Sequence, residues 1–164
     1  MPAEQRVCVL DAGPIIHLDQ VDALDLLCQL GQLVVPETVA REAEKHRLGI
    51  AARLANWIVP DPQTISRELL DVIQNFRLDA GESAALAWAQ QFGAELFVSD
   101  DKRAREAAGF LNYPSIGTLG VIEAAFNLGI LKKKEAVDLL ESLPRGTTLF
   151  VRPALLAAVL ARLR

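Results

Sequence analysis

The chain has 164 residues, 51% of them hydrophobic, and this length and composition predict one globular domain spanning residues 1–164. Its formal net charge of −4 argues against a protein that coats duplex nucleic acid with a broad basic face. The charge does not exclude an enzyme that acts on nucleic acid, because bound cations can reverse the sign of an acidic site.

The first half of the chain alternates short β-rich runs with stretches of helical spacing. In chain order, its predicted elements are a strand at 6–10, a turn at 11–14, a helix at 21–30, a strand at 32–36, a helix at 36–54, a brief strand at 57–60 and a helix at 66–76. Gly31 ends the first of these helices, and Pro36 suits the first turn of the second.

The second half continues the alternation. Its predicted elements are a helix at 78–93, a strand at 95–99, a helix at 101–109, a brief strand at 113–117, helices at 119–127 and 133–143, a strand at 147–151 and a helix from 153. Such alternation predicts an α/β fold with a mainly parallel sheet covered on both faces. Ligands of these sheets gather beyond the carboxyl ends of the strands, which directs attention to Asp11 and to the pair Asp100-Asp101.

The two cysteines, Cys8 and Cys28, lack the spacing of a metal site or a disulfide framework, and both are expected to be buried thiols. The chain shows neither a charged-then-apolar leader nor a run of about 18 apolar residues. These features predict a cytoplasmic protein that has no membrane partner.

Asp11 and Glu42 are the first two candidate site residues, and each has a structural alternative. Asp11 directly follows an apolar strand, where it either faces a ligand or bonds its own backbone in a turn. Glu42 lies three residues after Val39, at the edge of the buried face of its helix, where a lone carboxylate is costly. Its alternative is an ordinary helical pair with Lys45 or His46.

The other two acidic sites also admit two interpretations. Glu82 is placed as the capping-box partner of Asp79, but it also lies at the N-terminal end of an apolar stripe that points towards the sheet edge. Asp100 and Asp101 either form the cap and the first-turn acid of the next helix or contribute ligands to a site.

These acids can all reach one end of one sheet. Two unit charges about 4 Å apart repel by roughly 4 kcal/mol at an effective dielectric constant of about 20, so an unneutralised cluster would be strongly destabilising. A hard divalent cation removes this conflict, and ligation by oxygen alone suits Mg²⁺ or Mn²⁺. Carboxylate-held metals most often serve phosphate chemistry. No nucleophile elbow or catalytic triad supports acyl transfer.

Five segments, taken in order, resemble those of a PIN-domain protein: VLDAGPIIHL, VVPETVAREAEKH, LDAGESAALAWA, FVSDDKRAR and SIGTLGVIEAAFNLGIL. They most resemble the small prokaryotic branch related to the ribonucleases of toxin–antitoxin pairs. The resemblance covers residues 6–151. It implies a three-layer α/β/α sandwich and an endoribonuclease that hydrolyses RNA phosphodiesters with a water activated by Mg²⁺ or Mn²⁺, acting as the toxin of such a pair.

The resemblance also implies roles for individual residues. Asp11, Glu42, Glu82 and Asp100 match the catalytic metal ligands of the family, with Asp101 as an auxiliary ligand. Glu82 stands where many relatives carry aspartate. Which of the two adjacent aspartates binds metal directly stays open.

The expected substrate-binding residues are Ser99, Lys102, Arg103 and Arg105. Ser99 would orient a carboxylate or a water. The three bases either contact the phosphates of an RNA strand or form a solvated helix face. Near the end of the chain, the apolar helix PALLAAVLARL predicts a homodimer or an antitoxin-like protein partner, or else a helix that packs on its own sheet.

Two functions of other classes remain open. The first is a catalytically weak PIN-like binding module that acts through a protein partner, because a net charge of −4 does not help a protein to bind RNA. The second is a phosphoaspartyl enzyme or receiver. It fits less well, because Asp11 is followed by Ala12 and Gly13 without a second acid two residues on.

Overall fold

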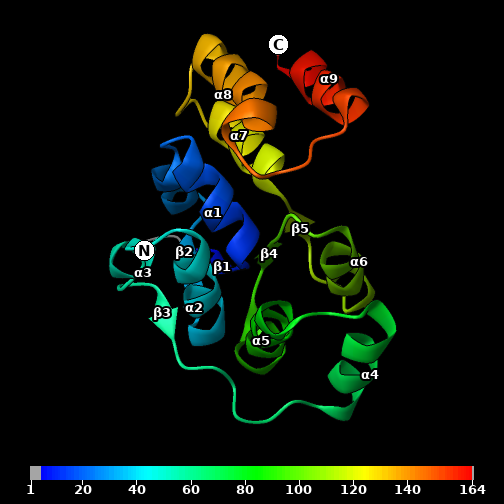
Figure 1. Ribbon diagram of the computed structural model, residues 1–164. Coiled ribbons are helices and arrows are strands. Elements are labelled where there is room, and N and C mark those ends of the chain that lie inside the picture. Colours follow the sequence, from blue (N-terminus) through cyan, green and yellow to red (C-terminus); the bar gives the residue numbers. More distant parts are fainter. Residues whose placement is uncertain (1–4, 164) are drawn as a thin grey trace.

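Five short parallel strands form one sheet in the order β3-β2-β1-β4-β5, and helices flank it (Figure 1). The computed structural model describes residues 5–163. The strands are β1 (Val7–Leu10), β2 (Gln32–Pro36), β3 (Ile58–Val59), β4 (Leu96–Val98) and β5 (Ser115–Ile116). The helices are α1 (Ala12–Gln20), the 3-10 helix η1 (Leu24–Gln29), α2 (Glu37–His46), α3 (Ile50–Arg53), α4 (Arg67–Phe76), α5 (Ala80–Trp88), the π-turn η2 (Ala89–Gly93), α6 (Lys102–Phe110), α7 (Thr118–Asn127), α8 (Lys133–Gly146) and α9 (Pro153–Arg162).

The sheet lies between two layers of helices. Helix α5 packs against β1 and β2, and α7 packs against α1 and η1 on the other side of the sheet (Figure 1). The parallel register pairs Val9 with Val34 on one side and with Phe97 on the other. The predicted three-layer α/β/α sandwich with a mainly parallel sheet is therefore confirmed.

The predicted start of the first helical region is wrong. Residues 11–14 do not form an isolated turn, because α1 begins at Ala12, whose N–H donates to the Asp11 side chain at 2.9 Å. Pro14 is tolerated because it lies in the first turn, where backbone N–H groups have no helical partner. The predicted helix at 21–30 is instead a turn followed by η1.

Two other predicted elements also differ. The single helix expected at 36–54 is divided into α2 and α3, because Gly49 has a φ of +89° and the Glu44 carboxylate accepts the N–H groups of Gly49 and Ala51. The strand expected at 147–151 does not form. Within residues 5–163, the sheet has no sixth strand, and this segment is an irregular connection between α8 and α9.

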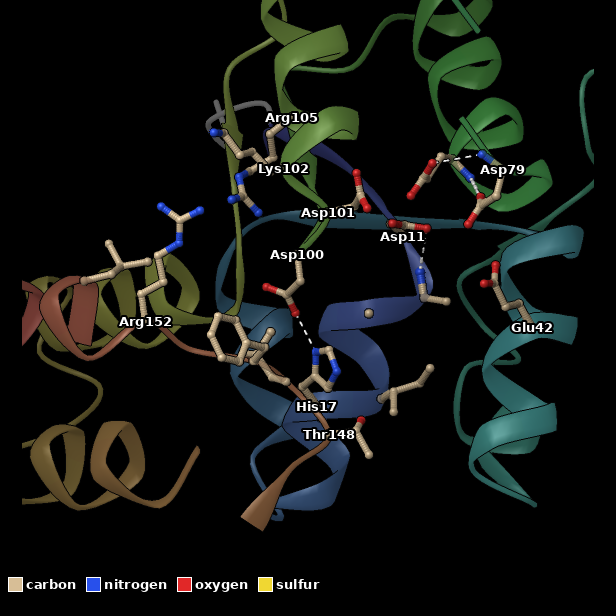
Figure 2. A pocket seen from close by; sticks show the side chains of 17 residues that line it. Asp11, His17, Glu42, Asp79, Asp100, Asp101, Lys102, Arg105, Thr148 and Arg152 are labelled. Atoms are coloured by element: carbon tan, nitrogen blue, oxygen red, sulfur yellow. Dashed lines mark hydrogen bonds and ion pairs between the residues drawn. The ribbon is translucent and has the colours of Figure 1, made fainter. Parts of the chain in front are cut away.

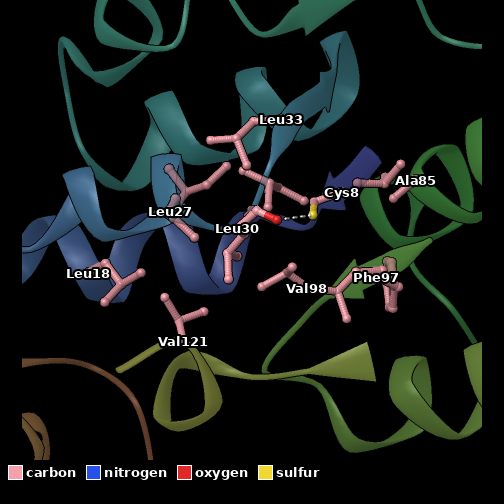
Figure 3. Packing of buried hydrophobic residues seen from close by; sticks show 14 of the residues in the cluster. Cys8, Leu18, Leu27, Leu30, Leu33, Ala85, Phe97, Val98 and Val121 are labelled. Atoms are coloured by element: carbon pink, nitrogen blue, oxygen red, sulfur yellow. Dashed lines mark hydrogen bonds between the residues drawn. The ribbon is translucent and has the colours of Figure 1, made fainter. Parts of the chain in front are cut away.

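The core fills both sides of the sheet. Phe97, the largest fully buried side chain, lies near Ala85 of α5, while Val98 faces Val121 of α7 (Figure 3). Cys8 is buried as expected, and its Sγ lies 3.5 Å from the Leu30 carbonyl oxygen. Cys28 is exposed, so the prediction of two buried thiols is wrong for this residue, which lies on the solvent side of η1.

Helix α9 packs against α7 and α8, and Val159 within it and Leu163 directly after it are buried. Its contacts are therefore made with the terminal helices of its own chain. Among the described residues, no helix combines the length and the apolar character needed to cross a membrane.

Replacing Phe97 with alanine should lower the free energy of unfolding by about 3–5 kcal/mol, because it leaves a cavity in a close-packed core. The matched control is Phe110→Ala, since Phe110 is 66% exposed at the end of α6 and should change this free energy by less than about 1 kcal/mol. Urea unfolding followed by circular dichroism measures both values. Equal losses for the two variants would contradict this description of the core.

Candidate active site

A pocket of about 680 Å³ opens at the carboxyl ends of β1 and β4, where the alternation of strands and helices predicts a ligand site. Six carboxylic acids line it: Asp11, Glu42, Asp79, Glu82, Asp100 and Asp101. We refer to it as the acidic pocket. Figure 2 shows Asp11 and Asp101 near its centre, with Glu42 and Asp79 on one side and Asp100 on the other.

Asp11 is the most deeply buried of these acids, at 6% exposure. Its backbone N–H donates to the Val98 carbonyl at 2.9 Å, which fixes it between the two central strands. Its Oδ2 accepts from the Ser99 hydroxyl at 2.8 Å. Burial raises the pKa of Asp11 to about 8, opposed by the Ser99 hydrogen bond and reinforced by the charge of Glu82. Ser99 is therefore hydrogen-bonded to a carboxylate, and its role towards a substrate stays a prediction.

Glu82 belongs to a complete capping box with Asp79. The Asp79 N–H donates to Glu82 Oε2 at 2.9 Å, and the Glu82 N–H donates to Asp79 Oδ1 at 2.8 Å. Burial raises the pKa of Glu82 to about 7, although the hydrogen bond from Asp79 lowers it, and the charges of Asp79, Asp101 and Glu42 add to the rise. The capping role of Glu82 and its place in the pocket thus occur together.

Glu42 projects from α2 towards the start of α5. Burial raises its pKa, and so does the charge of Asp79, while His46 and Lys45 lower it. Within residues 5–163 it forms no ion pair, so the helical pair with Lys45 or His46 is not what holds it. A Cβ atom at Gly81 would collide with Glu42 Oε2, so the glycine of the Gly81-Glu82 sequence leaves room for a second carboxylate.

Asp100 is held differently from the other acids. Its Oδ2 lies 2.6 Å from His17 Nδ1 and accepts from Thr118 Oγ1 at 2.6 Å, and its Oδ1 accepts from the Thr118 N–H at 2.6 Å (Figure 2). His17 lies 83 residues and Thr118 lies 18 residues from Asp100 in the sequence, so no local pattern connects them. Neither partner was predicted from the sequence. Asp100 does not cap α6, which was one of the alternatives.

Asp101 is the cap of α6. Its Oδ1 accepts from the Ala104 N–H at 2.9 Å, and its own N–H donates to the Ser99 hydroxyl at 3.2 Å. The same hydroxyl donates to Asp11, so one serine joins the ends of β1 and β4 and the start of α6. Asp101 therefore combines the cap role with a position in the pocket.

The basic side chains divide into two groups. Lys102 and Arg105 line the acidic pocket, and Arg105 Nη1 donates to the Ser99 carbonyl at 2.9 Å. Arg103 is exposed on α6 and is not among the residues that line the pocket. Arg152, which sequence reasoning did not identify, also lines it. Its only sequence signal is a base one residue before the proline that opens the last helix.

The acids supply the carboxylate oxygens that a hard cation prefers, although several of these oxygens accept hydrogen bonds from other groups of the protein. Among residues 5–163, no group of three His, Cys, Asp or Glu side chains is placed to hold a metal ion. Glu82 accepts the Asp79 N–H within the capping box, and Asp101 accepts the Ala104 N–H. Burial, with smaller contributions from neighbouring acids, raises the pKa values of Asp11, Glu42 and Glu82. Carboxylate oxygens are the ligands that Mg²⁺ and Mn²⁺ prefer. The residues therefore fit such an ion, and its binding stays a prediction.

The RNA substrate, the antitoxin-like partner, the homodimer and the cytoplasmic location also stay predictions.

A search of curated proteins finds no match to the chain. A family model described as a PIN domain matches residues 7–164, nearly the whole chain. PIN domains are in general nucleases and typically use divalent metal ions. The flanked parallel sheet and the acidic residues at its carboxyl edge agree with this match. The chain therefore belongs to the PIN-domain family.

Proposed function

We propose that the protein is an endoribonuclease that depends on Mg²⁺ or Mn²⁺ and that the acidic pocket is its active site. The observation that carries this proposal is the gathering of six carboxylic acids in one pocket at the carboxyl edge of the sheet. Elevated pKa values at Asp11 and Glu82 support it, because such shifts are frequent at functional sites.

Asp11, Glu42 and Glu82 are the residues that would hold the ion, with Asp101 beside them. A bound Mg²⁺ or Mn²⁺ would supply an activated water and would stabilise negative charge on the phosphate and on the leaving oxygen. Asp11 is already oriented by Ser99 and by the Ala12 N–H, so its carboxylate has little freedom to lose on binding.

The Asp100 carboxylate is held in a fixed orientation in the acidic pocket. Three donors from His17 and Thr118 hold its two oxygens, and these donors come from α1 and α7. Such contacts would keep Asp100 from turning towards the ion freely, so we assign the direct ligand role to Asp101 rather than to Asp100. Lys102 lines the same pocket and would attract the phosphates of a bound strand.

Glu42→Gln should reduce the rate of RNA cleavage in Mn²⁺ by about 100-fold, because it removes a carboxylate that would hold the ion. Cleavage is measured with a mixed-sequence RNA labelled at one end. Glu37→Gln is the matched control, since Glu37 lies on the same helix, is exposed and does not line the pocket. Equal rates for Glu42→Gln and the parent protein would place the activity elsewhere.

The binding module is the alternative that this assay separates. If the parent protein binds Mn²⁺ in a calorimetric titration but cleaves no RNA, the acidic pocket binds a cation without the nuclease reaction, and the proposal fails. Cleavage that a chelator abolishes and Mn²⁺ restores would exclude the binding module.

In chelator, the free energy of unfolding should fall as the pH rises from about 4 to about 8, since folding raises the pKa of Asp11 from 3.8 to about 8. The folded protein binds this proton more tightly than the unfolded chain, so the stabilisation is complete below the unfolded pKa and is lost through the folded pKa. Glu82, whose pKa rises from 4.5 to about 7, acts in the same direction. Urea unfolding at several pH values measures the trend.

Asp11→Asn should lose part of this pH dependence, because asparagine keeps the side-chain acceptor for the Ala12 N–H and cannot ionise. The variant should therefore gain stability relative to the parent protein as the pH rises, and Glu37→Gln should follow the parent. Mn²⁺ added at about pH 8 should stabilise the parent more than Asp11→Asn. Parallel pH profiles for the parent and Asp11→Asn would contradict the assignment of this proton to Asp11.

A further inference from the structure

The segment 147–152 forms one wall of the acidic pocket and carries an aromatic side chain in an unusual position. Phe150 is 84% exposed, whereas the next residue, Val151, is 9% exposed. Thr148, Leu149, Phe150 and Arg152 all line the pocket. Phe150 is outside the hydrophobic core, and it lies beside the pocket.

Hydrogen bonds and burial fix this segment on both sides of Phe150. The Thr148 N–H and hydroxyl both donate to Gln20 Oε1, at 3.0 and 3.3 Å, and the Leu149 N–H donates to Thr147 Oγ1 at 3.1 Å. Val151 anchors the other side in the core. Phe150 is therefore held outward by a segment that is tied to α1 and to the core.

Phe150 stands where two hollows meet. A second pocket, of about 350 Å³, extends from the acidic pocket along α7 to Glu123 and Arg162. The residues shared by the two pockets are Asp100, Arg105, Leu149, Phe150 and Leu155. The two hollows thus adjoin at Phe150, and we refer to the two together as the groove.

Charge is distributed unevenly along this groove. Figure 2 shows Arg105, Lys102 and Arg152 on the side of Asp100, away from Glu42 and Asp79. In the part of the chain that the structure describes, the Arg152 guanidinium makes no hydrogen bond or ion pair. A base without a protein partner at this place is suited to an anionic ligand.

We propose that this groove binds an unpaired RNA strand, with a base stacked on Phe150 and a neighbouring phosphate at Arg152. The inference rests on the proposed nuclease function and assigns Phe150 and Arg152 as substrate-binding residues outside the cluster of acids. An aromatic side chain can stack only on a base whose face is open, and the paired bases of a duplex are closed to it. The flexible backbone of an unpaired strand can then follow the groove to the acidic pocket.

The test measures binding by fluorescence anisotropy with a short, fluorescein-labelled, mixed-sequence RNA. The protein carries Asp11→Asn in Mn²⁺, so that binding is observed without cleavage. Phe150→Ala should weaken binding by about tenfold, within the range for loss of one base stack, and Phe150→Tyr should restore it. Because Phe150 is exposed, thermal unfolding should be unchanged in both variants.

Arg152→Gln should weaken binding and make the slope of log K against log salt less negative by about 0.7, the value for one phosphate contact on a single strand. Phe92→Ala and Arg67→Gln are matched controls, because both residues are exposed and lie outside the two pockets. Neither control should change the affinity.

Three results would overturn the inference. They are an unchanged affinity in Phe150→Ala, equally tight binding of a duplex of the same sequence, and a loss of self-association in Phe150→Ala by sedimentation while RNA affinity is retained. The last result would identify the surface as a protein interface. A parent protein that binds RNA through Phe150 without cleaving it would refute the proposed nuclease reaction and leave the RNA site in place, so the two failures are distinguishable.

Discussion

The burial of the Asp11 carboxylate between β1 and β4 is the constraint on which the site depends. The hydrogen bond from the Asp11 N–H to Val98 continues the ladder of the two central strands, so the side chain emerges at the middle of the sheet edge. Ser99, at the end of β4, meets it there. The core on both sides of these strands keeps the two ends in register. A buried carboxylate is costly without compensating charge, and the proposed ion would offset this cost.

The remaining acids show two ways of tolerating negative charge near Asp11. Asp79, Glu82 and Asp101 accept backbone N–H groups at the first turns of α5 and α6, where the helix dipole favours an anion. Asp100 faces His17 instead. The same carboxylates therefore cap helices and would also ligate the proposed ion, which would compete with the caps for their oxygens.

Local sequence patterns predicted most of the fold. They failed where contacts between residues far apart in the chain determined the structure. The short strands at β1, β2 and β4 were predicted correctly because their apolar runs are bounded by turn residues. The region after Asp11 was mistaken for a turn, since Asp11, Gly13 and Pro14 favour either a turn or the first turn of a helix. The segment 147–152 has the composition of a strand, but within residues 5–163 it pairs with no strand. Its Thr148 donates to Gln20 of α1 instead, and its Phe150 is exposed.

The sequence by itself determined that Asp11, Glu82 and Asp101 lie at the ends of strands or the starts of helices, because caps and strand ends are encoded by neighbouring residues. Only the tertiary structure decided that Glu42 approaches Gly81, that His17 and Thr118 hold Asp100, and that Phe150 and Arg152 face the same pocket. Those relations join residues far apart in the chain. They follow from how the helices pack on the sheet, which no local spacing specifies.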